Sequence, residues 1–466
     1  MANNKFRICI VCGRLGDVDG VSLEVNKWIE VFKGFGHEIF TIAGKYGSVL
    51  DNVQKENQLT LEKIGFHSKF QNHWEPLIFP NISKYPPHFD EDLYNEFIHE
   101  LETRSCECAN LIFGYIQEHD IDVLIGENTN AMPMTLVAGM ALYKLSVEKR
   151  VATIFHHHDF WWERSRFSNS HIERLLGKIM PPALPGLEHL VISSYAAHVL
   201  SCLKRVRAKV VPNCEDFDQP PVPDDYNRDF RKDLGFKEDD ILIVQPTRIV
   251  RRKKIEDSIE LVSKLIKKYP ELKPRVKFVI SLYQGDEPDE NYIEDINVLA
   301  GIKGVPISYI SDRVVAARRK NEKSEKMYTN RDVLVNADLV TYLPIWEGFG
   351  NALLEAIAAK VPVVVAQYLV YKTDIRISSL RTIEIRDQYS SEGILKIPDS
   401  VIDRVHKALA DPDARQKMVE RNFKVMAREF GFPKLRENLK DVLDDYGDEI
   451  RASRKRIHIS KTFYHV

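Results

Sequence analysis

Residues 341–366 read Thr341-Tyr-Leu-Pro-Ile-Trp-Glu347-Gly-Phe-Gly-Asn351-Ala-Leu-Leu-Glu355-Ala-Ile-Ala-Ala-Lys360, followed by Val361-Pro-Val-Val-Val-Ala366. The apolar, β-branched run before the glycines is typical of a strand buried in a parallel sheet, and the residues after Asn351 are rich in helix formers. Gly348 and Gly350 permit a tight turn, and Asn351 is suited to cap the helix that follows. The segment therefore predicts a strand, a glycine-rich turn, a helix and a second strand.

The start of this predicted helix is suited to bind an anion. Its first N–H groups have no partner within the helix, and the helix dipole adds partial positive charge at the same point. A phosphate would satisfy both. Glu347 on the turn and Glu355 in the helix flank this point, and each can accept hydrogen bonds from sugar hydroxyls.

Glu347-Gly-Phe-Gly-Asn351 together with Glu355 resembles the Glu, seven residues, Glu signature of retaining glycosyltransferases of the GT-B fold, and it is most like glycosyltransferase family 4. The resemblance implies an α/β protein with two Rossmann-like parallel-sheet domains that face each other across a cleft. It also implies that Glu347 holds the donor sugar and Glu355 the nucleotide ribose. The donor diphosphate would then contact the turn and the following amides, at Phe349, Gly350, Asn351, Ala352 and Leu353. The alternative is an ordinary helix N-terminus with a surface glutamate.

Length and composition describe a globular protein of two or three domains. The chain has 466 residues, of which 44% are hydrophobic, and a formal net charge of −2. That balance gives no overall basic field for nucleic acid. We expect a cytoplasmic protein, because the sequence shows neither a signal-peptide core nor an apolar run of membrane-spanning length. The six cysteines do not suggest a disulfide framework in a chain of this size.

A change of composition divides the chain. The stretch from Asn213 to Tyr226 is rich in Pro and Asp, which is typical of a connection between domains. We predict an acceptor-side domain at 1–212, a linker at 213–232, a nucleotide-sugar domain at 233–430, and at 431–466 a helix that returns to the first domain, followed by a basic tail.

The first half begins with a strand at 6–12, a glycine loop and a helix at 21–34. The loop lacks the G-x-G-x-x-G order of dinucleotide-binding enzymes, so it is weak evidence for NAD. By the family resemblance, Gly20 would face the cleft near the donor; a plain tight turn fits equally well. Residues 45–95 show no clear periodicity, and we predict an irregular segment there.

Two polar clusters follow predicted strands of this half, where open α/β sheets place ligands. Glu127 and Asn130 follow the strand at 122–125, and they suit either acceptor contacts or the capping of the next helix. The second cluster follows the strand at 151–155 and reads His156-His-His158-Asp159-Phe-Trp161-Trp.

Consecutive histidines on one strand end diverge, so we expect no metal site at this second cluster. Family 4 enzymes commonly carry a His here, close to the donor sugar and the acceptor. By that resemblance His158 would be catalytic and Asp159 would contact the acceptor, with His157 as a second candidate. Trp161 could stack on a sugar ring or pack in the core.

The second half carries a basic run after the strand at 240–245. Arg248 and Lys253 resemble the Arg and Lys of family 4 that neutralise the donor diphosphate as it leaves. The family usually has Gly where this chain has Lys254. A second basic stretch, at 313–331, is predicted to be helical, and it suits an anionic membrane surface, an anionic acceptor or a solvated helix face.

These observations predict a retaining enzyme that moves a hexose from a nucleotide-diphosphate sugar, of the UDP-glucose or GDP-mannose type, to a hydroxyl of a small sugar-like acceptor. Stabilisation of the leaving diphosphate by cations and helix amides requires neither a metal nor a cofactor. The oligomeric state is left open. Alternatives are a disaccharide phosphorylase on the same fold, a peripheral membrane glycolipid transferase and a nucleotide-sugar-binding protein without catalysis.

Overall fold

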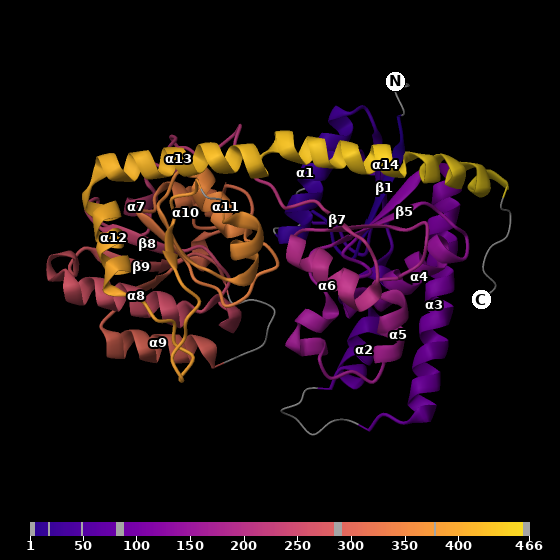
Figure 1. Ribbon diagram of the computed structural model, residues 1–466, viewed down its shortest axis with the longest axis horizontal. Helices are drawn as coiled ribbons and strands as arrows, with labels where there is room; N and C mark the ends of the chain where they lie inside the picture. Colours follow the sequence, from indigo (N-terminus) through magenta and orange to yellow (C-terminus); the bar gives the residue numbers. More distant parts are fainter. Residues whose placement is uncertain are drawn as a thin grey trace. The chain divides into compact units, whose positions relative to one another are not determined.

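The computed structural model describes residues 5–16, 19–47, 50–80, 88–283, 291–376 and 379–459. The chain divides into two compact units (Figure 1). We call residues 1–212 with 435–466 the N-terminal unit, and residues 213–434 the C-terminal unit. The predicted linker at 213–232 lies within the C-terminal unit, and the part of the predicted basic tail at 460–466 lies outside the described residues.

Among the described residues of the N-terminal unit, seven strands form one sheet in the order β3-β2-β1-β4-β5-β6-β7. Every pair in this sheet is parallel. The central strands are buried, which explains why they appear in the sequence as continuous apolar runs. The strands are β1 Arg7–Cys12, β2 Glu38–Ala43, β3 Gln58–Thr60, β4 Val123–Glu127, β5 Thr153–His157, β6 Glu188–Val191 and β7 Lys209–Val210.

Helices cover both faces of this sheet. Figure 1 shows α2 to α5 on one side of it and α1 on the other. The helices that follow the strands are α1 Gly20–Gly34, α2 Lys69–Ile78, α3 Glu91–Glu118, α4 Leu136–Val147, α5 Glu173–Ile179 and α6 Ser194–Lys204.

The last helix, α14 Phe432–Ile459, is attached to the N-terminal unit by polar contacts with β5. The Ser453 hydroxyl accepts a hydrogen bond from the Ala152 N–H at 2.8 Å. The Tyr446 hydroxyl accepts one from the Thr153 N–H at 3.2 Å and donates one to the Gly186 carbonyl at 2.8 Å. These contacts lie at the amino end of β5, away from its carboxyl end.

The C-terminal unit repeats the architecture. Within its described part, six strands form a parallel sheet in the order β10-β9-β8-β13-β14-β15. Figure 1 shows α8 and α9 together on one side of the sheet, and α10 and α11 on the other. The strands are β8 Ile241–Gln245, β9 Val276–Ile280, β10 Ile307–Tyr309, β13 Leu339–Tyr342, β14 Val363–Ala366 and β15 Ile383–Ile385. The helices are α7 Phe230–Asp233, α8 Ile255–Lys268, α9 Tyr292–Lys303, α10 Asn330–Val335, α11 Asn351–Ala358, α12 Asp399–Ala410 and α13 Pro412–Phe430.

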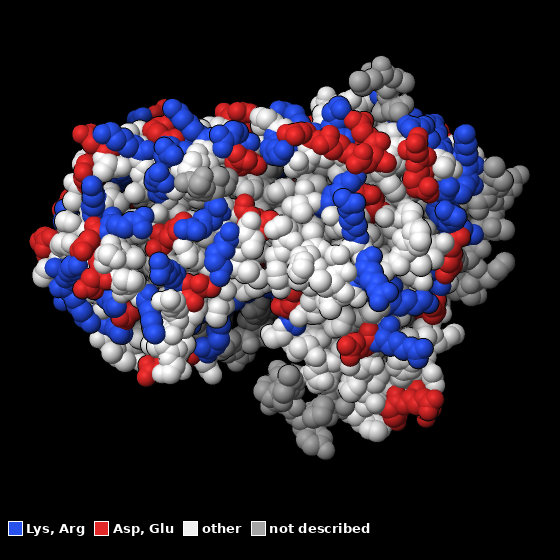
Figure 2. Space-filling model, in the orientation of Figure 1, with Lys and Arg blue, Asp and Glu red and all other residues white. Residues whose placement is uncertain are grey.

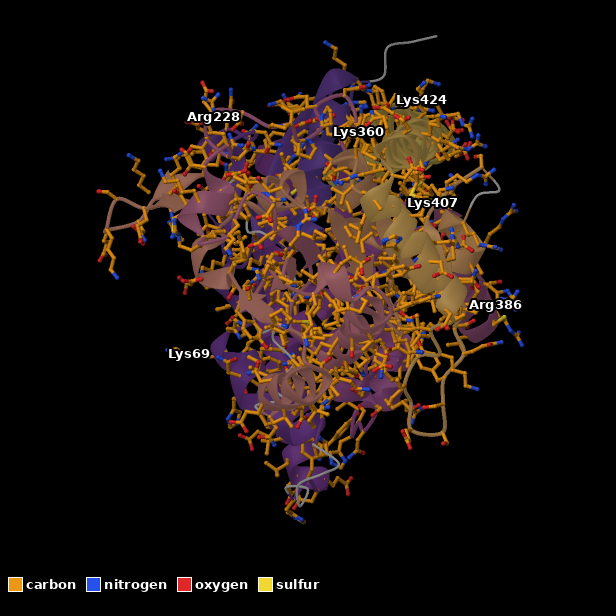
Figure 3. All side chains as sticks on the ribbon, turned by 90° about the vertical axis from the view of Figure 1, so that its left-hand side faces the viewer. Lys69, Arg228, Lys360, Arg386, Lys407 and Lys424 are labelled. Atoms are coloured by element: carbon orange, nitrogen blue, oxygen red, sulfur yellow. The ribbon has the colours of Figure 1, made fainter. Side chains whose placement is uncertain are left out.

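The C-terminal end of α11 is anchored on α13. Lys360 follows this helix with a left-handed backbone, at φ 55°, and its ammonium pairs with Glu420 at 2.8 Å. The same ammonium lies over the Phe423 ring, 4.8 Å from its centroid. Figure 3 shows Lys360 near α13, which also carries Lys424. The anchor holds the helix whose opposite end is the predicted anion site.

Two expectations about local structure were wrong. The segment 45–95, expected to be irregular, contains β3 and α2, because Ser68 caps this helix and Phe70 and Trp74 turn into the core. The second expectation concerned the stretch 313–331.

That stretch is a hairpin followed by α10, with strands β11 Arg319–Lys320 and β12 Lys326–Met327 paired antiparallel. The Asn321 side chain accepts hydrogen bonds from the N–H groups of Lys323 and Glu325, which closes the turn. A run of charges without an apolar stripe has no face to bury as a helix, so the local turn is formed instead.

Surface charge is mixed. On the face seen in Figure 2, Lys and Arg alternate with Asp and Glu over the C-terminal unit. None of the helices in the described ranges is both long and apolar enough to cross a membrane.

Candidate active site

The glycine turn between β13 and α11 has a backbone that only glycine adopts without strain. Gly350 caps α11 with φ 150° and ψ 50°, and a Cβ there would lie 2.4 Å from the Tyr368 hydroxyl oxygen. That hydroxyl donates to the Phe349 carbonyl at 2.6 Å. The first helical hydrogen bonds run from Leu353 and Leu354 to the Gly350 carbonyl, so the N–H groups of 351 and 352 precede them.

The expectation that Asn351 is the N-cap was therefore off by one residue. Asn351 is the first helical residue, and its side-chain oxygen accepts a hydrogen bond from Asn213 at 2.8 Å. Tyr368 fills the space beside the turn, so the cap position must be occupied by glycine. The start of α11 thus remains the predicted anion site. The Asn351 side chain there is hydrogen-bonded to Asn213, the first residue of the C-terminal unit.

Glu347 is a buried carboxylate held between two cations. Its side chain accepts from Arg252 Nη1 at 2.8 Å and forms an ion pair with the Lys253 ammonium. Burial of Glu347 disfavours its charged form, but the charges of Lys253 and Arg252 outweigh it and lower the pKa of Glu347 to about 2. Glu347 is therefore ionised at neutral pH.

The two cations come from the loop after β8, the 3-10 turn Arg251–Lys253. The Ile345 N–H donates to the Arg252 carbonyl at 3.0 Å, which joins this loop to the segment carrying Glu347. Burial and the charges of Arg252 and Arg248 lower the pKa of Lys253 to about 8, against the opposing charge of Glu347. Arg248 thus lies in the same electrostatic cluster.

Lys254 takes the conformation that a glycine would take at this position. It lies in the left-handed region, at φ 50° and ψ 55°, at the start of α8. Its ammonium donates to the Gly393 carbonyl at 3.0 Å and pairs with Glu256 at 2.9 Å. The left-handed turn is therefore formed by a lysine where the family usually has glycine. The two contacts of the lysine side chain offset part of the backbone strain.

Lys254 offers a test of that strain. We expect Lys254→Val to melt about 2–4 °C below Lys254→Gly, because a β-branched residue costs about 1–2 kcal/mol in the left-handed region and glycine costs almost nothing there. Both variants lose the same side-chain bonds, so the comparison isolates the backbone. Differential scanning calorimetry of the two proteins measures it, and equal melting temperatures would show that the turn does not constrain φ.

Glu355 is fixed by a chain of side-chain hydrogen bonds at the carboxyl edge of the sheet. Its carboxylate accepts from Asn330 Nδ2 at 3.0 Å. The Asn330 oxygen in turn accepts from the Ser281 hydroxyl at 2.9 Å. Ser281 follows β9, Asn330 begins α10 and Glu355 lies in α11, so segments from three places in the chain meet at Glu355.

The structure adds Arg252, Asn330 and Tyr368 to the residues expected from the sequence. Arg252 was part of the basic run noted there, but the sequence could not show that the 3-10 turn directs two consecutive cations to Glu347. Asn330 carries no local signal. Tyr368 begins a polar loop, 368–374, that the sequence places near the site, but the sequence does not show its contact with the glycine turn.

Gly20 lies at the start of α1 in the N-terminal unit. The N–H groups of Val21 and Ser22 donate to the Asp19 carboxylate, each at 3.0 Å. This cap already satisfies the first amides of the helix, so a ligand near Gly20 would meet a carboxylate beside them.

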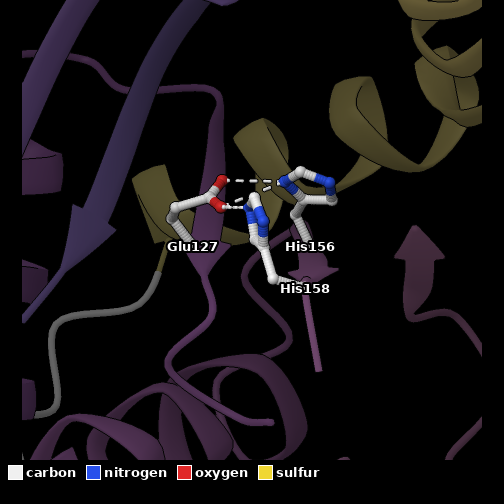
Figure 4. Close-up of side chains that lie close together, drawn as sticks. All are labelled: Glu127, His156 and His158. Atoms are coloured by element: carbon white, nitrogen blue, oxygen red, sulfur yellow. Dashed lines mark hydrogen bonds and ion pairs between the residues drawn. The ribbon is translucent and has the colours of Figure 1, made fainter. Parts of the chain in front are cut away.

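Glu127, His156 and His158 form a hydrogen-bonded cluster at the carboxyl ends of β4 and β5 (Figure 4). Glu127 lies opposite His156 in the parallel pairing of these strands. Its carboxylate lies 2.9 Å from His156 Nδ1 and 2.7 Å from His158 Nε2. Side chains two positions apart on a strand share a face, which is why His156 and His158 meet.

The three side chains each offer an atom of a type that ligates metals, and these atoms lie within 4.8 Å of one another. We expected neighbouring histidines to diverge, and His157 does turn away from the other two. That argument did not consider His156 and His158, which are two positions apart and share a face. The measured separations of 2.7 and 2.9 Å are hydrogen-bond distances. Around a tetrahedral ion with bonds of about 2.0–2.1 Å, ligand atoms would lie about 3.3 Å apart.

Two of the predicted acceptor residues, Asn130 and His157, are buried and have partners within the N-terminal unit. Asn130 is fully buried and donates to the carbonyls of Gly139 and Ile179, each at 2.9 Å. His157 is buried on the opposite face from His156, and its Nε2 lies 3.0 Å from His189 Nδ1. Alternation along β5 places His157 in the core, and a buried loop uses the Asn130 amide to satisfy its carbonyls.

Of the other two, Asp159 is buried and Trp161 is partly accessible, and both have partners within the unit. Asp159 binds Arg164, whose Nε donates at 2.6 Å. The Trp161 indole donates to the Met180 carbonyl at 3.0 Å, and its ring packs against the hydrophobic core. His158 follows the end of β5, and its side chain is 10% exposed. It is therefore the histidine of this cluster that a ligand could reach.

Comparison with known proteins assigns the chain to a family. A family model described as glycosyl transferases, group 1, matches residues 227–425. The mannosylglucosylglycerate synthase of Thermotoga maritima is 33% identical over 453 residues, which cover 94% of this chain and 99% of that protein. The chain belongs to the group 1 glycosyl transferases. The protein of the same name from Petrotoga mobilis is 28% identical over 438 residues, covering 89% of this chain and 96% of its own.

Solved structures show the same fold at low sequence identity. Sucrose-phosphate synthase from Thermosynechococcus elongatus matches with a TM-score of 0.63 at 10% identity, covering 95% of this chain and 100% of its own. WaaG, a glycosyltransferase of lipopolysaccharide biosynthesis, matches with a TM-score of 0.58 at 14% identity, covering 93% and 99%. The predicted GT-B class, with two Rossmann-like parallel-sheet domains, is confirmed, and the protein is a glycosyltransferase.

Proposed function

We propose that this glycosyltransferase moves a mannosyl residue from a nucleoside-diphosphate mannose to a hydroxyl of glucosylglycerate, with retention at the anomeric carbon. The support for donor and acceptor is the 33% identity, over nearly the whole of both chains, to a protein whose name describes that product. The support for retention, and for membership of family 4, is the Glu347 to Glu355 signature in its observed strand, turn and helix setting.

The observation that carries the proposed chemistry is the buried ion cluster of Glu347, Arg252 and Lys253 beside the start of α11. In the reaction the bond between the anomeric carbon and the diphosphate oxygen breaks, and a bond to the acceptor oxygen forms. The acceptor proton leaves with the departing phosphate oxygens. The main demand is therefore to stabilise negative charge on those oxygens.

The residues of the C-terminal unit suit that demand. Arg248 and Lys253 would bind the diphosphate together with the amides of residues 349–353, while Glu355 would hold the ribose. Glu347 would position the sugar and support the positive charge that develops at the anomeric carbon. No metal is required in this scheme, since cations of the chain neutralise the diphosphate. In the N-terminal unit, His158 would meet the reacting sugars.

The test is a transfer assay with GDP-mannose and UDP-glucose as donors and with glucosylglycerate, glucosylglycerol and glucose as acceptors. We expect turnover with a mannose donor and glucosylglycerate, the pair that the name of the 33% identical relative describes. Activity should persist in EDTA, and the anomeric one-bond C–H coupling of the product should match the donor's configuration. Inversion, or transfer only in the presence of a divalent cation, would contradict the proposal.

Two further results would change the proposed acceptor or the proposed reaction. Equal rates with glucosylglycerol would show that the carboxylate is not recognised. Release of a sugar phosphate when inorganic phosphate is added to the product would indicate a phosphorylase.

A further inference from the structure

Glu127 is a buried carboxylate whose side-chain hydrogen-bond partners, within the described ranges, are two histidines. Its exposure is 2%, and one carboxylate oxygen lies 2.9 Å from His156 Nδ1 while the other lies 2.7 Å from His158 Nε2. Burial favours the neutral acid, but the two histidines outweigh it and lower the pKa of Glu127 to about 2. Glu127 is therefore an anion at neutral pH.

An ionised carboxylate can only accept hydrogen bonds, so both ring nitrogens that face it must carry protons. This fixes the tautomers: His156 is protonated on Nδ1, and His158 on Nε2. The Trp28 ring stacks on His156 with centroids 4.3 Å apart, and the remaining His156 nitrogen is buried. Of the two histidines, His158 is the one whose side chain is partly exposed, and its second ring nitrogen is Nδ1.

The charge around the cluster favours a positive His158. Burial lowers the pKa of His156, and the opposing charge of Glu127 does not reverse it. Burial also acts to lower the pKa of His158, but its hydrogen bond to Glu127 and the charges of Glu127, Glu24 and Asp159 raise it above its ordinary value. Glu24 of α1 is itself buried and paired with Lys27 at 2.6 Å, and Cys12 of β1 lies near Glu127.

We propose that Glu127 is a positioning residue for His158: it fixes the ring orientation and the Nε2–H tautomer, keeps the imidazolium form populated, and leaves Nδ1 as the nitrogen that meets the reacting sugars. The role of His158 at the reacting sugars rests on the proposed function. The pairing of Glu127 with His158 does not, because it is a property of the free protein.

The free protein gives the first test. With [13C]Cε1-labelled histidine, the His158 resonance is identified by its loss in His158→Gln and followed from pH 5 to pH 9. We expect an apparent pKa above the ordinary histidine value of about 6.5. In Glu127→Gln the His158 pKa should fall by about one unit or more, because the anion that stabilises the imidazolium is gone.

The enzyme gives the second test. In Glu127→Gln, kcat for mannosyl transfer should fall at least about tenfold. The limb of the pH profile that belongs to His158 should move to lower pH, in the same direction as the resonance. Glu188→Gln is the matched control, since Glu188 is a partly buried carboxylate at the opposite end of this sheet, paired with Lys209 at 3.2 Å. It should leave the profile in place.

Three results would overturn the inference: a His158 pKa at or below the ordinary value in the wild-type protein, an unmoved limb in a folded Glu127→Gln, or a stoichiometric metal that this variant loses. If Glu127→Gln does not fold, the wild-type titration decides. If the raised pKa and its shift are found but no mannosyl transfer occurs, the proposed function fails and the Glu127–His158 pairing stands.

Discussion

Glu347→Gln is expected to lower kcat for glycosyl transfer by about 10²- to 10³-fold while the affinity for the nucleoside diphosphate does not fall. Glutamine keeps the shape of the side chain but removes the negative charge that would support the anomeric carbon in the transition state. The change also removes the carboxylate charge that faces Arg252 and Lys253 in the free protein. Because both cations attract the diphosphate, its affinity should not fall in this variant.

The measurement is steady-state kinetics with the mannose donor, together with calorimetric titration of the nucleoside diphosphate. Leaving two buried cations without their carboxylate should also lower the melting temperature, and the diphosphate should restore it. Glu355→Gln is the contrasting variant, since loss of the ribose contact should weaken nucleotide binding more than kcat. An unchanged kcat in Glu347→Gln would remove Glu347 from the reacting site.

Lys253→Met is expected to raise the Kd of the nucleoside diphosphate by about 10- to 100-fold and to lower kcat, because a buried charged hydrogen bond to the phosphate is lost. The neighbouring Arg251 is the matched control. It is about half exposed and pairs with Asp295 at 2.9 Å, so Arg251→Gln should leave the Kd nearly unchanged. Equal effects of the two variants would contradict the assigned cradle.

The same lysine predicts a pH dependence. Its pKa in the free protein is lowered to about 8 by burial, so it is charged below that pH and loses its proton above it. Only the charged form attracts a phosphate, and the affinity of the wild-type protein should therefore fall as pH rises through about 8. Lys253→Arg should keep its affinity over this range, because arginine stays protonated. Calorimetric titration between pH 7 and pH 9.5 compares the two.

Local sequence signals predicted the strands, the glycine turn and α11 well, because each depends on neighbours in the chain. The apolar runs around Val340 and Val364 are buried on both faces in a parallel sheet, and Gly350 stands where a Cβ would strike Tyr368. The same kind of reasoning failed for the stretch 313–331, where many charges suggested a helix and the Asn321 turn formed a hairpin.

The residues around the site were harder to predict, since their roles depend on contacts between distant segments. His157 and Asn130 are polar residues at strand ends, and by sequence they suit a ligand as well as His158 does. The fold turns His157 into the core against His189 and uses Asn130 to satisfy the carbonyls of Gly139 and Ile179.

The amino-acid sequence alone indicated the α/β class and the group of enzymes, and it predicts Glu347, Arg248 and Lys253 as site residues, because a periodic apolar pattern and a short motif are local properties. The tertiary structure decided which charges meet. Arg252 and Lys253 reach Glu347 from 95 and 94 positions away, and Glu127 reaches His156 and His158 from the neighbouring strand. Such pairings depend on strand order and on the face to which each side chain turns, and these are set by how the whole sheet packs.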